Sequence, residues 1–450
     1  MVFDKSTIKP ISLFKEEAMI LAKRIAILGG GPMGLSFAYE LSKLGYQVEI
    51  FEADDRLGGM TSTFDFEGLN IERFYHFHTT SDNDYFSYLK ELGIFKNLNW
   101  RSTKMGFYVK GNLYKWGSLG ALLKFPHLNL YSKLRYMVHI FYSSKILNWK
   151  SIDNKNAVSW LQKWLGKESY QLLWYSLLHY KFYGLKNSIS AAWIQMRIKR
   201  IANSRSVTLK EKLGFLDGSS QLFIDSIEKK LKKNKVIIHK SSPVKKIVIK
   251  KNTVKKIVLK NGLSADFDYF ISTIPIPYIQ KIAPDLPKDY LKLLSNIKNV
   301  GVVCLILKLK SNFTDYFWLN INDENMDIPG IIEYTNLNPL NQSILYIPYY
   351  MPINMEKFKK SDDFFIKQTI GYLKKIKASF DLNDILSIKV NRYRHAQPVC
   401  EKNFLKKIPK FKVSNIDNLF IGDTSFYYPE DRGISESIRF AKRMVKLYFV

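Results

Sequence analysis

Residues 24–59 read RIAILGGGPMGLSFAYELSKLGYQVEIFEADDRLGG, and this stretch decides the fold class. Its apolar start, Ile25–Leu28, is typical of a buried parallel strand. Three glycines follow in the spacing G-x-G-x-x-G: Gly29, Gly31 and Gly34. In a dinucleotide-binding turn the first glycine permits the tight turn, the second lets a pyrophosphate approach, and the third lets the next helix pack closely. The sequence therefore predicts a strand–turn–helix unit that binds a dinucleotide.

A helix and a second strand complete this unit. Pro32 suits the first helical turn, because its missing N–H needs no partner there. The free N–H groups and the dipole of a helix N-terminus favour a phosphate group, so we expect Pro32 and Met33 to contact the cofactor. The second strand ends at Glu52, 23 residues after Gly29, which is close to the spacing of an acid that binds the ribose.

Length and composition narrow the class of protein. A chain of 450 residues can bury a large core, and this length predicts two domains. Its two cysteines and seven histidines show no ligand spacing, so we expect no metal site. No apolar run is long enough to span a bilayer, and the few cysteines favour a reduced, cytoplasmic location. Residues 1–21 are interpreted as an extension before the first strand.

The net charge of +29 is unevenly distributed. Leu92–Ile152 contain no Asp or Glu, and aromatic residues and leucines are interleaved with ten cations: Lys96, Arg101, Lys104, Lys110, Lys115, Lys124, Lys133, Arg135, Lys145 and Lys150. One interpretation is a solvated basic face over an aromatic core in a lysine-rich chain. The other is contact with an anionic membrane surface, at the inner face of the membrane, or with a phosphorylated substrate. No nucleic-acid motif is present, so we expect no nucleic-acid partner.

The segment after the second strand carries a family resemblance. Arg56-Leu57-Gly58-Gly59 resembles the R-x-G-G segment of the flavin amine oxidase and phytoene desaturase superfamily, to which protoporphyrinogen-oxidase-like proteins also belong. In that family the segment lies against the FAD pyrophosphate. The resemblance implies that the cofactor is FAD and adds four contacts: Arg56, Gly58, Gly59 and Met60.

The C-terminal part resembles the same superfamily. Residues 418–423, NLFIGD, and 431–438, DRGISESI, are similar to its signature of a strand ending in Gly-Asp and a helix led by Gly. The resemblance implies that the Asp holds the ribityl–phosphate region and that the helix N-terminus faces the flavin. The residues concerned are Gly422, Asp423, Gly433 and Ile434, and Val244 takes the place of a backbone contact to adenine.

Two histidines stand between these motifs. His76 and His78 would share one face of a strand, because side chains alternate there. An ordinary hydrogen-bonded pair on a surface strand and a lining for flavin or substrate both fit this pattern. The stretch also resembles the H-x-F-H-T segment of UDP-galactopyranose mutases, which are flavoproteins. His76 and His78 are therefore the catalytic candidates.

The resemblance implies an α/β fold, with a glutathione-reductase-like FAD-binding Rossmann domain and an inserted α+β substrate domain. The FAD-binding domain would comprise residues 22–104, 205–275 and 386–450, and the substrate domain residues 105–204 and 276–385. Within the substrate domain we expect mainly helices before residue 204. Later we expect strands at 300–310 and 344–350 and a proline-rich interruption of regular structure at 348–352.

Three functions compete at this point. The first is an FAD-dependent oxidoreductase that transfers hydride between flavin N5 and a small lipid-like or amine substrate. The second is a redox-neutral, flavin-dependent nucleotide-sugar mutase in which Arg197, Arg200 or Arg205 holds the diphosphate. The third is a flavin-binding protein without turnover. No residue declares itself a catalytic base, and a second G-x-G-x-x-G for a nicotinamide nucleotide is absent from the sequence.

Overall fold

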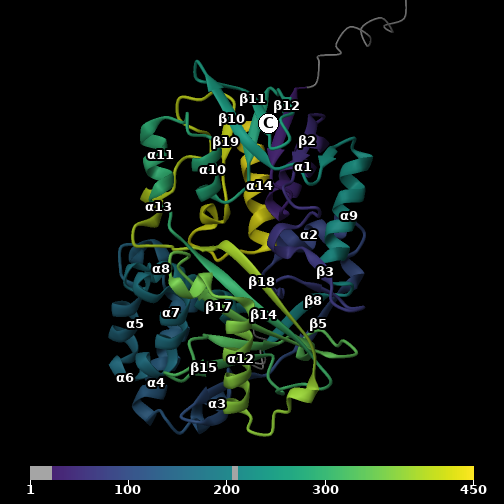
Figure 1. Ribbon diagram of the computed structural model, residues 1–450. Helices are drawn as coiled ribbons and strands as arrows, with labels where there is room; N and C mark the ends of the chain where they lie inside the picture. Colours follow the sequence, from purple (N-terminus) through teal and green to yellow (C-terminus); the bar gives the residue numbers. More distant parts are fainter. Residues whose placement is uncertain (1–22, 205–210) are drawn as a thin grey trace, which may run out of the picture.

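The computed structural model describes residues 23–204 and 211–450 and shows a mixed α/β fold (Figure 1). The extension at residues 1–21 lies outside the described residues. Two large sheets organise the chain, one parallel and one mixed. Figure 1 shows the parallel sheet in the upper part of the molecule and a group of helices at the opposite, lower end.

The parallel sheet has the strand order β19-β13-β1-β2-β9. Its strands are β1 (Arg24–Leu28), β2 (Gln47–Phe51), β9 (Ile237–His239), β13 (Tyr269–Ser272) and β19 (Leu419–Ile421). All four strand pairs are parallel, and β1 lies in the centre. A central strand is covered on both faces, which explains why residues 25–28 are continuously apolar and buried.

Two helices cover the same side of this sheet. α1 (Pro32–Lys43) follows the glycine turn, and α14 (Ile434–Tyr448), near the C-terminus, packs against it. The start of α1 lies so close to the turn that a Cβ atom on Gly34 would come within 1.9 Å of the Gly29 carbonyl oxygen. Glycine at position 34 is therefore required for this helix to pack where it does.

The mixed sheet has the strand order β18-β14-β17-β16-β15-β6-β7. Its strands are β6 (Met105–Val109), β7 (Asn112–Trp116), β14 (Asn299–Leu309), β15 (Trp318–Asn322), β16 (Gly330–Glu333), β17 (Ser343–Met351) and β18 (Ile385–Pro398). β14 is buried on both faces, since Val302, Cys304 and Ile306 join one hydrophobic cluster and the residues between them join another.

The proline-rich stretch does not interrupt this sheet, so that prediction is wrong. β17 continues through Pro348, which lies opposite Cys304 of β14. On its other side β17 pairs with β16 only as far as Tyr346. Pro348 lies past the last residue of β17 that pairs with β16. A proline is tolerated at such a position, because β16 does not need its N–H.

The sheet pairing of β18 bears on the expected domain boundary. β18 pairs with β14 along most of its length, from Ile385 to Pro398. The segment assigned from residue 386 onward to the FAD-binding domain therefore begins inside the mixed sheet, beside strands assigned to the substrate domain.

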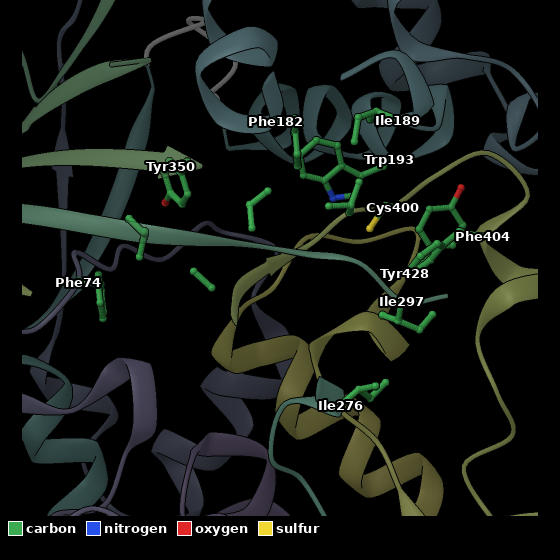
Figure 2. Close-up of a cluster of buried hydrophobic side chains, with 14 of the residues drawn as sticks. Phe74, Phe182, Ile189, Trp193, Ile276, Ile297, Tyr350, Cys400, Phe404 and Tyr428 are labelled. Carbon is green, nitrogen blue, oxygen red and sulfur yellow. The ribbon is translucent and has the colours of Figure 1, made fainter. Parts of the chain in front are cut away.

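The helices expected before residue 204 form a layer at one end of the mixed sheet (Figure 1). They are α3 (Leu119–Lys124), α4 (Leu130–Phe141), α5 (Ala157–Leu165), α6 (Lys167–Tyr170), α7 (Ser176–Phe182) and α8 (Ala191–Asn203). Side chains cap the N-termini of four of them: Ser118, Asn129, Asn156 and Ser190. Figure 2 shows Trp193 of α8 beside Phe182 of α7 and Cys400, where this layer joins the main hydrophobic core.

The remaining strands and α-helices flank or connect these layers. The strands are β3 (Thr63–Asp65), β4 (Asn70–Glu72), β5 (Leu98–Ser102), β8 (Lys212–Leu216), β10 (Val244–Lys250), β11 (Thr253–Leu259) and β12 (Ser264–Ala265). The helices are α2 (Asn83–Glu91), α9 (Ser219–Lys233), α10 (Ile276–Ile282), α11 (Lys288–Ser295), α12 (Asp362–Ile376) and α13 (Phe404–Lys407). Within residues 23–204 and 211–450, no helix has the length and apolar content needed to cross a membrane.

Candidate active site

A cavity of about 1050 Å³ lies between the parallel sheet, the mixed sheet and helices α7 and α8. The sequence-predicted site residues that line it are Gly29, Gly31, Pro32, Met33, Glu52, Gly59, Met60, His76, His78, Val244, Asp423, Gly433 and Ile434. These residues come from both ends and the middle of the chain, and the fold brings them to one cavity. A volume of this size lies at the upper end of the usual range for ligand pockets.

The glycine turn shapes one end of the cavity. Gly29 has a φ angle of +103°, which favours glycine, and its N–H donates to the Phe51 carbonyl at 2.9 Å. A Cβ atom on Gly31 would meet no other atom within 4 Å, although Gly31 lines the cavity. The space beside Gly31, at the N-terminus of α1, is therefore open to a ligand and fits a pyrophosphate.

Glu52 lies directly after β2 and faces this turn. Its Oε2 accepts the N–H of Gly30 at 2.5 Å, and its Oε1 accepts the N–H of Asp54 at 2.8 Å. Burial raises the pKa of the carboxyl, and these two backbone N–H groups oppose that shift. The position at the cavity wall fits a carboxylate that accepts ribose hydroxyls and also holds the turn against the end of the strand.

Four predicted site residues lie behind the cavity wall. Gly34 packs under Gly29, and Gly58, at a φ of +105°, donates its N–H to the Gly30 carbonyl at 2.8 Å. Gly422 donates to the Ser272 carbonyl at 3.0 Å. Arg56 pairs with Asp55 and donates to the Thr63 carbonyl at 2.9 Å. The structure thus does not bring these four to the cavity surface; the three glycines shape the backbone that forms it.

Asp423 and the N-terminus of α14 form the wall farther along the cavity. Asp423 Oδ2 accepts the N–H of Ile276 at 3.0 Å, and its Oδ1 accepts the N–H of Ser425 at 2.9 Å. The buried carboxyl, whose pKa is raised by burial, therefore ties the start of α10 to the end of β19. Gly433 and Ile434 place the free N–H groups of α14 at the cavity, where the helix dipole favours negative charge.

The two histidines line the cavity, but they do not lie on a regular strand. Only His78 pairs with another segment, through a bridge to Gly214. The interpretation as a pair on a surface strand is therefore wrong. Burial, together with the charges of His78 and Arg432, lowers the pKa of His76 to about 3. His76 is thus neutral near pH 7, and its Nδ1 has no hydrogen-bond partner among the described residues.

His78 is held by its neighbours. Its ring stacks on Tyr85 with a centroid distance of 4.3 Å, and its Nδ1 lies 3.8 Å from Asp82 Oδ2. Asp82 also pairs with Arg200 of α8 at 3.3 Å. His78 is therefore oriented by a carboxylate that is shared with a cation of the cavity wall.

A group of four cations, which we call the cation cluster, lines the cavity near α14: Lys181, which is buried, and Arg197, Arg200 and Arg432, which are half-buried. Arg197 pairs with Asp431, whereas Arg432 donates to the Tyr350 hydroxyl at 3.1 Å and to the Ala396 carbonyl. Lys181 lies 5.2 Å from the centre of the Trp193 ring and 5.1 Å from that of Tyr350. Within the part of the chain that the structure describes, Lys181 Nζ has no hydrogen-bond or ion-pair partner.

The cation cluster perturbs the groups around it. Burial, aided by the charge of Arg197, lowers the pKa of Lys181 well below its usual value. Burial opposes the charge of Asp431, but Arg197, Lys181 and Arg432 hold the pKa of this carboxyl below its usual range. Burial raises the pKa of Glu436, in the first turn of α14, to about 7. Clusters of perturbed groups of this kind are typical of functional sites.

Sequence reasoning missed two members of the cation cluster. Arg197 and Arg200 were considered as diphosphate ligands, and both line the cavity; Arg205 lies outside the described residues. No motif or spacing marks Lys181, and lysine is rarely buried, so the sequence carries no signal for its position. Arg432 lies inside the C-terminal signature, which implies no role for it. No group of three or more metal-ligating side chains occurs among the residues that the structure describes.

Comparisons with known proteins identify a family and several relatives. The family described as flavin-containing amine oxidoreductases matches residues 34–395. A zeta-carotene desaturase of Solanum lycopersicum is 35% identical over 131 residues, which cover 28% of this chain and 21% of the desaturase. A mitochondrial protoporphyrinogen oxidase of Nicotiana tabacum is 28% identical over 152 residues, covering 33% of this chain and 30% of that enzyme. The matches thus span less than a third of either relative.

Solved structures extend the likeness to nearly the whole chain. The structure of a reduced UDP-galactopyranose mutase superimposes with a TM-score of 0.72 and 16% identity, covering 96% of this chain and 95% of the mutase. At this level of identity the likeness shows the fold alone.

Proposed function

Because the chain belongs to the family of flavin-containing amine oxidoreductases, whose cofactor is FAD, we propose that it is an oxidoreductase that transfers hydride between a small substrate and the flavin. The observation that carries the proposal is the single cavity that joins the glycine turn, Asp423, the N-terminus of α14 and the cation cluster. When bound, the flavin supplies the hydride chemistry at N5. The residues of this chain supply binding, orientation and exclusion of water.

We infer that the parallel sheet with α1 and α14 is an FAD-binding Rossmann domain of the glutathione-reductase type. Starting from β9, the strand order of the sheet is β9-β2-β1-β13-β19. When these five strands are numbered along the chain, this is the 3-2-1-4-5 order of doubly wound sheets, which bind dinucleotides at the carboxyl ends of their strands. Gly31 and the N-terminus of α1 would hold the pyrophosphate, and Glu52 the adenosine ribose. Val244 lines the cavity at the same end, in line with an adenine contact.

The flavin ring would lie toward the N-terminus of α14. The dipole of α14 favours negative charge at that point, and this would stabilise a reduced, anionic ring. The ring of His76, which is neutral near pH 7, would line the cavity without contributing a charge. Tyr75, Tyr350 and Tyr393 also line this part of the cavity, and burial raises the pKa of Tyr75 and Tyr393, so neither is ionised at neutral pH. These side chains would orient the substrate and keep water out.

The cation cluster supports a substrate that carries an anionic group, such as a phosphate or a carboxylate. Its four cations face two carboxylates, Asp82 and Asp431, together with Glu436, whose pKa of about 7 leaves it only partly ionised near neutral pH. Among the described residues Lys181 has no carboxylate partner, although a buried ammonium without a partner is costly. An anionic group on the substrate would return Lys181 to its charged form and balance the cluster.

The test is an anaerobic screen with the purified flavoprotein. Mixing with candidate amines, lipid-like alkenes and their phosphorylated forms should bleach the visible absorbance of the oxidised flavin for the true substrate class, without added reductant. In Lys181→Met the KM for an anionic substrate should rise at least tenfold while FAD content is unchanged. The matched control is Lys308→Met, since Lys308 is equally buried but bonds the Glu67 carbonyl outside the cavity. An unchanged KM in Lys181→Met would contradict the anionic substrate.

The nucleotide-sugar mutase is the second candidate, and one observation favours it: Arg197 and Arg200 both reach the cavity. Each is, however, already paired with a carboxylate, Asp431 and Asp82 respectively. The mutase is redox-neutral, so it would turn over only after the flavin is reduced, for example with dithionite, and the flavin would remain reduced after each turnover. Turnover of a nucleotide sugar that requires prior reduction would replace the oxidoreductase proposal.

A further inference from the structure

The outer face of α4 is apolar and exposed. Four side chains follow one another at helical spacing along it: Leu130, Leu134, Val138 and Phe141. They are 75%, 54%, 48% and 61% exposed, respectively. The opposite face is packed, since His139 is fully buried with its ring 4.8 Å from that of Trp160. The helix is thus held to the protein by one face and offers large apolar groups on the other.

This exposed surface extends beyond α4. We call it the apolar face, and it consists of Leu119, Leu123, Leu130, Tyr131, Leu134, Val138, Phe141 and Ile146. In the described part of the chain 22 large apolar side chains are exposed, and these eight lie within a stretch of 28 residues. Isolated exposed apolar side chains are normal, but such a concentration indicates an interaction surface.

Cations surround the apolar face, and carboxylates are absent from its segment. Lys124, Lys133, Arg135 and Lys145 belong to the same elements or adjoin them, and residues 92–152 contain no Asp or Glu. The contacts of these cations are with uncharged oxygens: Lys133 with the Leu123 carbonyl, Arg135 with the Lys163 carbonyl, and Lys145 with the Asn203 amide. Their charges are therefore left to attract an external anion.

We propose that the apolar face docks on an anionic lipid bilayer. The leucine and aromatic side chains would enter the headgroup and upper acyl region, while the lysine and arginine side chains would reach the lipid phosphates. A second copy of this chain is a poor occupant, because an isologous contact would bring identical basic surfaces together without compensating carboxylates. A bilayer with anionic headgroups would bury the apolar side chains and neutralise the positive charges.

The position of the apolar face in the fold agrees with this orientation. Figure 1 shows α3 and α4 at the end of the molecule opposite the parallel sheet. The π-helical turn Tyr142–Ile146 that follows α4 is joined to the C-terminal end of α8 through the Lys145–Asn203 contact. Arg197 and Arg200 of α8 line the cavity. α8 would therefore connect the segment that follows the apolar face to the wall of the cavity.

Flotation of the full-length, FAD-loaded protein with vesicles tests the proposal. We expect binding to vesicles that contain phosphatidylglycerol, little binding to vesicles of phosphatidylcholine alone, and a loss of binding as salt rises, because salt screens the charges. Lys124→Gln/Lys145→Gln should weaken binding to anionic vesicles by at least about tenfold, given roughly 1 kcal/mol per cation. Leu130→Ser/Phe141→Ser should weaken it by a similar factor.

Two double variants elsewhere on the surface serve as matched controls. Leu263→Ser/Leu447→Ser changes two side chains that are 66% and 64% exposed, and Lys255→Gln/Lys256→Gln removes two exposed lysines of β11. Both should bind anionic vesicles like the wild type, and all four variants should keep their FAD content. Equal binding to neutral and anionic vesicles, no binding at low salt, or a loss of binding in the control variants but not in the face variants would overturn the proposal. Self-association without lipid that the Leu130→Ser/Phe141→Ser variant abolishes would assign the face to a second copy instead.

Discussion

At the residue scale, the local motifs could be predicted and the cation cluster could not. Gly31 and Glu52 belong to the same strand–turn–helix–strand unit, so their spacing in the chain fixes their relative positions in space. Lys181 and Arg432 are far apart in the chain and meet only because α7 and the segment before α14 pack around one cavity. No spacing rule connects these two residues, because tertiary packing alone decides which charged side chains line the same cavity.

Gly31→Val should separate folding from cofactor binding. The φ of Gly31 is −74°, and a Cβ atom at this position would meet no protein atom within 4 Å, so we expect the chain to fold. The same side chain would occupy the space that fits the pyrophosphate, and the purified variant should contain no FAD. Flavin release on denaturation measures this.

A matched control for that variant is Gly371→Val. Gly371 is an exposed residue of α12, and a Cβ atom there would also meet no atom within 4 Å. It should retain FAD like the wild type. A Gly31→Val protein that keeps its FAD through dialysis would show that the pyrophosphate lies elsewhere.

At the element scale, strands and helices with a strong apolar pattern could be predicted from the sequence. The effects of strand pairing on neighbouring segments could not. The predicted strand at 300–310 is β14, Asn299–Leu309, because a continuous apolar run is typical of a strand buried on both faces. The break expected at Pro348 did not occur, since the cost of a proline depends on which side of the strand lacks a partner, and the sequence does not show this. The extended segment of His76 and His78 lacks regular pairing for a similar reason: its neighbours come from distant parts of the chain.

The first turn of α14 should make stability depend on pH. Burial raises the pKa of Glu436 to about 7 in the folded chain, from 4.5 in the unfolded chain. Between these values the folded state binds more protons than the unfolded state, so the free energy of unfolding falls as pH rises. Each unit of pKa difference is worth about 1.4 kcal/mol, so this carboxyl should remove up to about 3 kcal/mol between pH 4.5 and pH 7.

Glu436→Gln removes this titration. Urea unfolding with saturating FAD, at several pH values from 5 to 8, measures the free energy of unfolding of both proteins. This range covers roughly the pH values at which the carboxyl changes charge. The free energy of unfolding of the variant should exceed that of the wild type increasingly as pH rises. Parallel pH curves for the two proteins would contradict the raised pKa.

At the whole-molecule scale, one cavity is built from segments that are hundreds of residues apart. The glycine turn, the start of β10 at Val244 and the N-terminus of α14 all line it. The family resemblance predicted that these segments converge. It did not predict the sheet to which β18 belongs, because strand pairing in the mixed sheet is decided by packing against β14 rather than by any motif.

FAD should therefore stabilise the whole chain and not only one element. A ligand that binds only the folded state raises the free energy of unfolding by about 2.7 kcal/mol at a concentration of 100 times its Kd. Differential scanning calorimetry of FAD-depleted protein, with and without added FAD, should show a rise in Tm with a single transition. The Gly31→Val protein should show no rise. A Tm that is indifferent to FAD in the wild type would mean that the cofactor does not bridge these segments.

The packing of α14 against α1 also has a consequence for synthesis on the ribosome. The glycine turn leaves the ribosome early, but its partner helix is made only after some 400 further residues, or roughly 20 to 80 seconds of translation. During that time the nascent chain exposes the apolar side of α1 that α14 later covers, and it offers flavin an incomplete site. The cofactor site can therefore be completed only after α14 has been made and has packed on α1.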